Sequence, residues 1–148
     1  MAETRSSAHF LAASFRCGKR SLMAFTLSLP KAARRHLNAA QTLAEGHHRP
    51  VAGYLYGIAA ECAIKSMMVA SARSNEAFYA HFPELRTYLR DFLSGRNARP
   101  LSAFINDDSF MRNWNIRMRY ADGKEVRHEW VDEWANQAGR AVSAMEAF

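Results

Sequence analysis

A cluster of cationic and aromatic residues near position 115 offers the clearest chemistry in the sequence. It consists of Arg112, Arg117, Arg119 and Tyr120. Guanidinium groups bind phosphate oxygens and tyrosine rings stack on nucleobases, so these residues are candidates for binding RNA or a nucleotide. The structural alternative is that Arg119 forms an ion pair within the fold, with Glu61 or with an acid on the last helix such as Asp132.

A histidine that follows this cluster is the candidate for catalysis. His128 comes after Arg119 in the sequence, beyond a turn that contains Gly123. Histidine exchanges protons near neutral pH, so Arg119 and His128 could act together in a metal-independent ribonuclease. The sequence shows no nucleophile or carboxylate positioned to assist His128. Catalysis is therefore the alternative to binding.

Two charged residues interrupt the longest apolar stretch of the chain, residues 51–69. Glu61 and Lys65 are four residues apart with the acid first, the favourable order for a helical ion pair. We expect a buried structural pair, and the functional alternative is a polar pocket shared with Tyr54 and Ile58. Charges in the middle of the stretch argue against a membrane span and favour a buried core helix.

Composition narrows the class of protein. The chain has 148 residues, which predicts one domain, and its 49% hydrophobic content is typical of a globular protein. A net charge of +6 favours acidic partners. The two cysteines, Cys17 and Cys62, do not suggest a disulfide, which fits a reducing cytoplasm. Because no Cys or His spacing typical of metal sites occurs, we expect neither metal nor cofactor.

The first 27 residues differ from the rest of the chain. They are rich in Ser, Ala, Arg and Lys and contain one acid, Glu3. This composition is typical of an organelle transit peptide, or of a non-structural extension that precedes a start at Met23. We expect residues 1–27 to form an arm outside the fold, and residues 28–148 to form the folded domain.

Helical periodicity predicts the secondary structure. Apolar residues recur at helical spacing in segments 30–45, 51–71, 83–94, 100–105, 109–120 and 126–147. Gly46 is expected to end the first helix in a left-handed conformation, and the short linker after it predicts an antiparallel hairpin. The fold class is therefore all-α, an antiparallel up-and-down bundle of four to six helices.

Two apolar faces are expected to form the core of this bundle. On the central helix, the stripe consists of Val51, Leu55, Ile58, Cys62 and Val69, and it is widened by Ala52, Ala59, Ala63 and Ala70. The last helix contributes Trp130, Val131, Trp134, Ala138, Ala141, Val142 and Met145. In segment 109–120, Trp114 shares the apolar side with Phe110 and Met118. Because the tryptophans fall on apolar faces, they are expected to pack in the core rather than to stack on a ligand.

The order of these features resembles the HEPN domains, a superfamily of helical bundles. The motifs are Ala59-x-Glu61-x-x-x-Lys65, His81-Phe82-x-x-Leu85 and the segment from Trp114 to Tyr120. The resemblance implies a helical bundle that forms a homodimer. Many HEPN domains are metal-free RNA endonucleases, whereas others bind RNA or nucleotides, or act as antitoxins or as partners of nucleotidyltransferases.

The sequence departs from the nuclease signature of that family. The signature is an arginine, a polar residue and then a histidine, but here Arg112 and Asn113 are followed by Arg117 in the histidine's place. Arginine cannot act as a general base at neutral pH. The resemblance therefore implies a non-catalytic module that binds RNA or nucleotide, in the setting of a toxin–antitoxin or defence-type system. The alternatives are the ribonuclease with Arg119 and His128, and a protein-interaction subunit.

Overall fold

The computed structural model describes residues 25–72, 79–94 and 98–148. The elements are α1 (Leu29–Glu45), α2 (Arg49–Ala72), α3 (Glu84–Leu93), α4 (Arg99–Ile105), the 3-10 helix η2 (Ile116–Tyr120) and α5 (His128–Glu146). No strand occurs within these ranges, and the predicted all-α bundle is confirmed. None of the helices in these ranges is both long and apolar enough to cross a membrane. The arm expected at 1–27 lies outside the described residues except for its last three.

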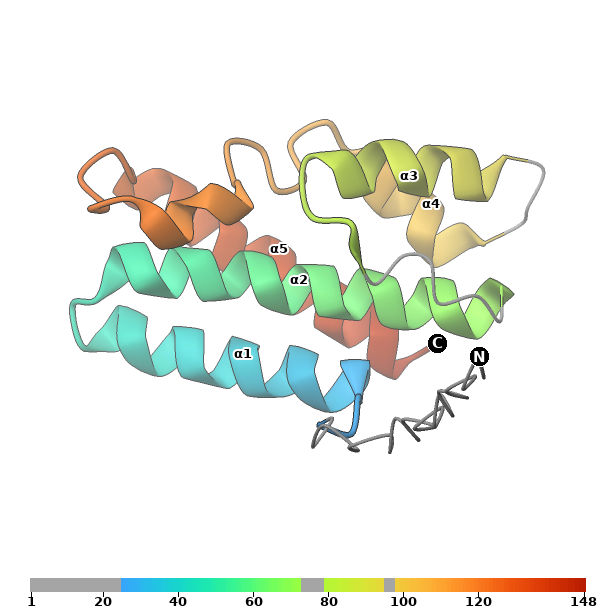
Figure 1. Ribbon diagram of the computed structural model, residues 1–148, viewed down its shortest axis with the longest axis horizontal. Helices are drawn as coiled ribbons and strands as arrows, with labels where there is room; N and C mark the ends of the chain where they lie inside the picture. Colours follow the sequence, from blue (N-terminus) through green and yellow to red (C-terminus); the bar gives the residue numbers. More distant parts are fainter. Residues whose placement is uncertain (1–24, 73–78, 95–97) are drawn as a thin grey trace, which may run out of the picture.

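Helix α2 lies at the centre of the bundle and packs against α1 and α5 (Figure 1). The hairpin of α1 and α2 is antiparallel, as predicted. Arg49, at the start of α2, forms an ion pair with Asp132 near the start of α5. Arg34 in α1 pairs with Glu146 at the end of α5, with 2.6 Å between Nε and Oε1. Helix α5 therefore runs in the same direction as α2 and opposite to α1.

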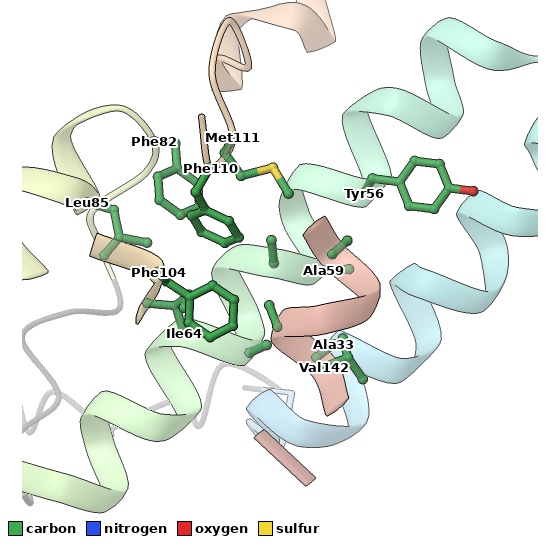
Figure 2. Packing of buried hydrophobic residues seen from close by; sticks show 14 of the residues in the cluster. Ala33, Tyr56, Ala59, Ile64, Phe82, Leu85, Phe104, Phe110, Met111 and Val142 are labelled. Atoms are coloured by element: carbon green, nitrogen blue, oxygen red, sulfur yellow. The ribbon is translucent and has the colours of Figure 1, made fainter. Parts of the chain in front are cut away.

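The segments between α2 and α5 cover the outer side of α2. Helices α3 and α4 lie over its C-terminal half, and η2 lies over its N-terminal half (Figure 1). The rings of Phe82, Phe104 and Phe110 gather above α2 beside Ile64 (Figure 2). The ring centroids of Phe104 and Phe110 are 4.9 Å apart, and those of Phe82 and Phe110 are 5.7 Å apart. This aromatic layer fixes α3 and α4 on the bundle.

Part of the predicted stripe on α2 forms the core. Ala52, Ala59 and Ala63 are 0% exposed, as predicted, whereas Val51 is 52% exposed, Ala70 is exposed and the other four members are only partly buried. The remaining deeply buried apolar residues of α2 are Tyr56, Ala60, Ile64, Met67 and Met68. The predicted stripe was incomplete because α2 is contacted on several sides.

Two tryptophan rings, one from the turn before η2 and one from α5, pack against glycines of α2. A Cβ atom at Gly57 would lie 1.9 Å from Cε2 of Trp114, and one at Gly53 would lie 3.0 Å from Cζ3 of Trp134. Both tryptophans are buried, as predicted, whereas Trp130 is only partly buried. Because a glycine leaves room where a side chain would stand, the rings pack directly on the backbone of α2.

Segment 109–120 is not the helix that its apolar spacing predicts. Turns occupy it up to Asn113, and only Ile116–Tyr120 is helical, as η2. Met111 (φ 52°) and Asn113 (φ 65°) adopt left-handed backbone conformations. The side chain of Gln137 in α5 accepts a hydrogen bond from the N–H of Met111 at 2.6 Å. Bonds of this kind satisfy backbone groups without a helix.

The turn between α1 and α2 also differs from the prediction in detail. Gly46 has φ −81°, and the left-handed residue is His47, at φ 67°. The N–H groups of Gly46 and His48 donate to the carbonyls of Thr42 and Leu43, at 3.1 and 2.8 Å. These bonds close α1 at Glu45, as predicted, and only the left-handed residue lies one position later than expected.

Candidate nucleic-acid interface

The predicted cluster lies on η2 and on the turn before it. Arg112, Arg117, Arg119 and Tyr120 are all exposed, and Tyr120 is 82% exposed. Segment 109–121 contains three arginines and no acidic residue. Buried Trp114 anchors it: the indole N–H donates to the carbonyls of Gly53 at 3.1 Å and Tyr54 at 3.2 Å. Trp114 thus fixes a segment whose exposed arginines and tyrosine form a cationic, aromatic surface.

Arg119 is held in place without an acidic partner. Its Nε donates to the carbonyl of Ile116 at 3.2 Å, and its guanidinium carbon lies 5.4 Å from the centre of the Tyr120 ring. Neither ion pair considered for Arg119 is formed, because Glu61 pairs with Lys65 and Asp132 pairs with Arg49. Among the described residues, no carboxylate lies within 4.0 Å of its guanidinium. The Arg119 charge is therefore available to an anionic ligand.

Arg112 and Arg119 line two separate hollows. Arg112 borders one of about 360 Å³ together with Arg86, Asp108 and Trp114. Arg119 borders one of about 240 Å³ between the start of α2 and the residues that follow η2. The backbone of Arg112 is fixed because its carbonyl accepts a hydrogen bond from Nε1 of Trp134 at 2.8 Å. The cluster is thus an extended surface rather than a single pocket.

Arg86 has a structural role beside the first hollow. Its guanidinium donates to the carbonyl of Asp107 at 2.9 Å and to that of Phe110. Burial lowers the pKa of Arg86, and the neighbouring charge of Arg90 adds to this effect. Arg86 joins α3 to the turn that precedes Arg112, so Arg112 alone offers an exposed cation there.

Glu61 and Lys65 are buried in the bundle, 2% and 5% exposed, with 3.7 Å between Oε2 and Nζ. The same oxygen lies 2.8 Å from Nδ1 of His81, and Oε1 accepts a hydrogen bond from the N–H of Phe82 at 2.7 Å. Glu61 therefore connects α2 to the segment that leads into α3. Sequence reasoning missed these bonds because His81 and Phe82 are far from Glu61 in the chain.

His128, the catalytic candidate, is the exposed first residue of α5. Its carbonyl accepts a hydrogen bond from Nη2 of Arg49 at 3.2 Å. His128 is not among the residues that line the hollow beside Arg119. The described contacts of His128 thus serve the junction of α2 and α5. No group of three or more His, Cys, Asp or Glu residues that could hold a metal ion occurs in the described ranges.

The smaller hollow contains residues that were not predicted to lie beside Arg119; the sequence had suggested Tyr54 only for a polar pocket with Glu61 and Lys65. Tyr54 and Val51 come from α2, Met118 from η2, and Asp122 and Val126 from the loop that follows. Because separate elements contribute them, no local pattern in the sequence marks them as a group. Only Arg119 carried a signal, through its charge and its neighbour Tyr120.

Comparisons with known proteins were made at the level of families, curated sequences and solved structures. No protein-family model, no curated protein and no solved structure matches the chain. The resemblance to HEPN domains therefore stays a prediction.

Proposed function

We propose that the protein is a non-catalytic, HEPN-like module that binds RNA or its nucleotides through Arg112, Arg117, Arg119 and Tyr120. The observation that carries this proposal is that the three arginines and Tyr120 of segment 109–121 are exposed, that this segment contains no acid, and that Tyr120 lies beside the guanidinium of Arg119. Arginines contact phosphates, and an exposed ring gives a base a surface to stack on. The resemblance further implies a toxin–antitoxin or defence-type system as the setting and a nucleotidyltransferase as a partner.

The binding is expected to depend strongly on salt, because each neutralised phosphate releases bound counterions. For single strands, each contact changes the slope of log K against log salt by about 0.7. Three arginine contacts therefore predict a slope of roughly −2, and a roughly fifteenfold loss of affinity between about 50 and 200 mM salt.

The test is a fluorescence-anisotropy titration of a labelled 12-nucleotide RNA across salt concentrations. Arg112→Ala and Arg119→Ala should each weaken binding severalfold and reduce the slope by about 0.7. Arg35→Ala is the matched control, because it removes the same charge from the exposed side of α1. An equal loss in all three variants would show that net charge, and not this surface, drives the binding.

The same RNA, incubated with the protein and a chelator, tests the ribonuclease alternative. Cleavage that His128→Ala abolishes would establish an enzyme and overturn the proposal. The absence of both cleavage and binding would favour the protein-interaction subunit.

A further inference from the structure

The hollow beside Arg119 has the size of a site for one ring system. Its volume of about 240 Å³ lies below the roughly 300 Å³ at which pockets for drug-sized ligands begin. Its apolar lining includes Val51, Tyr54, Met118 and Val126. A flat, weakly polar group such as a nucleobase fits such a lining, because burial of its faces removes apolar surface from water.

The walls of this hollow are fixed by contacts outside it. The Tyr54 ring stacks on buried Trp114, with 6.0 Å between centroids and 18° between planes. Gly123, also in the lining, has φ 88°, and a Cβ atom there would lie 2.8 Å from Cβ of Pro50. The loop thus packs closely on the start of α2. A preformed hollow loses little conformational entropy when a ligand enters.

Two charged groups in the lining differ in what they offer a ligand. Arg119 has no carboxylate within 4.0 Å in the described part of the chain, so it can bind a phosphate. The Asp122 carboxylate accepts a hydrogen bond from the Lys124 N–H at 2.9 Å, and the Lys124 ammonium lies 3.1 Å away. These bonds lower the pKa of Asp122 and keep it ionised. An ionised carboxylate accepts hydrogen bonds but cannot donate them.

We propose that this hollow binds one base of a single-stranded RNA and selects bases that carry an exocyclic amino group. The phosphate lies on Arg119, the base enters between Tyr54 and Val126, and its amino group donates to Asp122. Adenine, cytosine and guanine carry such a donor, whereas the exocyclic groups of uracil are carbonyl oxygens, which flank its single ring N–H and which an ionised carboxylate repels. This inference rests on the proposed function and names the part of the RNA that the site reads.

The test uses the full chain and three small probes: AMP, UMP and ribose 5-phosphate, each titrated by saturation-transfer NMR. AMP should bind roughly fivefold more tightly than UMP, and ribose 5-phosphate should bind most weakly. Equal binding of AMP and ribose 5-phosphate would overturn the proposal, because it would leave only phosphate attraction. Asp122→Asn should remove the preference, since an amide can also donate to uracil.

A filling substitution tests whether the hollow itself is the site. Val51→Trp places a large ring in it from a position that is already 52% exposed, so the fold should tolerate the change. AMP affinity should fall at least tenfold, whereas Ala39→Trp, on the exposed side of α1, should leave it unchanged. If Val51→Trp fails to fold by circular dichroism, Arg119→Ala provides the second variant, with a similar expected loss.

The RNA titration separates this inference from the proposed function. If RNA binds with a steep salt dependence but AMP and UMP bind equally, the proposed function stands and the base site is overturned. If AMP binds selectively in the hollow but RNA does not bind, the RNA function falls and the hollow remains a nucleotide site. If Val51→Trp weakens both AMP and RNA, both proposals are supported.

Discussion

Substitution of Gly57 tests the contact that positions the candidate interface. In Gly57→Ala, the new Cβ would lie 1.9 Å from Cε2 and 2.1 Å from Nε1 of Trp114. Trp114 is only 2% exposed, so its ring has no open space to enter. Since the neighbouring backbone belongs to the central helix, the ring and the segment attached to it must move.

The change in the free energy of unfolding of Gly57→Ala is the sum of two destabilising contributions and one stabilising contribution. Overpacking of a core costs about 1–3 kcal/mol, and loss of the Trp114 hydrogen bonds to Gly53 and Tyr54 costs about 1 kcal/mol more. Alanine stabilises a helix interior by about 0.5–1 kcal/mol relative to glycine. The net loss is therefore about 1–3.5 kcal/mol, or roughly 3–14 °C in melting temperature for a domain of this size.

Urea unfolding followed by circular dichroism measures this loss. Gly139→Ala is the matched control, because nothing lies within 4 Å of the added Cβ and α5 should become about 0.5–1 kcal/mol more stable. Gly53→Ala should fall between the two, since its Cβ would meet Trp134 at 3.0 Å. A Gly57→Ala protein as stable as Gly139→Ala would refute the proposed packing of Trp114.

Three further predictions concern the buried groups and the assembly. Glu61→Gln should lower the free energy of unfolding in urea by roughly 3 kcal/mol, because the negative charge beside the buried Lys65 ammonium is lost. Adding Lys65→Met should recover most of this loss, and a double variant as unstable as the single one would contradict the prediction. Burial raises the pKa of the Cys62 thiol to about 11, so in a Cys17→Ser background iodoacetamide at pH 8 should react with it roughly a hundredfold more slowly than in urea. Equal rates in both conditions would show that the thiol is not shielded. The homodimer that the resemblance implies should appear in light scattering as twice the chain mass, and a monomer at all concentrations would exclude it.

Most helices could be predicted because apolar residues recur in them at the helical period. Segment 30–45 was expected to be helical and α1 spans Leu29–Glu45, while α5 begins two residues after its expected start at Val126. The turns were not predictable in the same way. The spacing of Phe110 and Trp114 fits a helix, yet bonds from Gln137, 26 residues beyond Met111, hold that backbone in another conformation. Such long-range bonds leave no local pattern.

The members of the candidate site that could be predicted from the sequence are the arginines and the adjacent Tyr120. Arg119 and Tyr120 are adjacent in sequence and on η2, so their types alone pointed to a ligand. The hollow beside them depends on Tyr54 and Asp122, which come from distant parts of the chain. Tyr54 and Asp122 come close together only when α2 and η2 pack against each other, so the local sequence does not predict the hollow.

Cross-linking by ultraviolet light shows whether RNA binds at Arg112, Arg117, Arg119 and Tyr120, because it records which residues touch the RNA. The full chain is irradiated with single-stranded RNA of mixed sequence, digested and analysed by mass spectrometry. If RNA binds at the proposed surface, cross-links form at Tyr120 and Tyr54, and their yield falls at both residues in Arg119→Ala. Cross-links confined to the cationic side of α1, around Lys31 and Arg35, would show that RNA binds elsewhere.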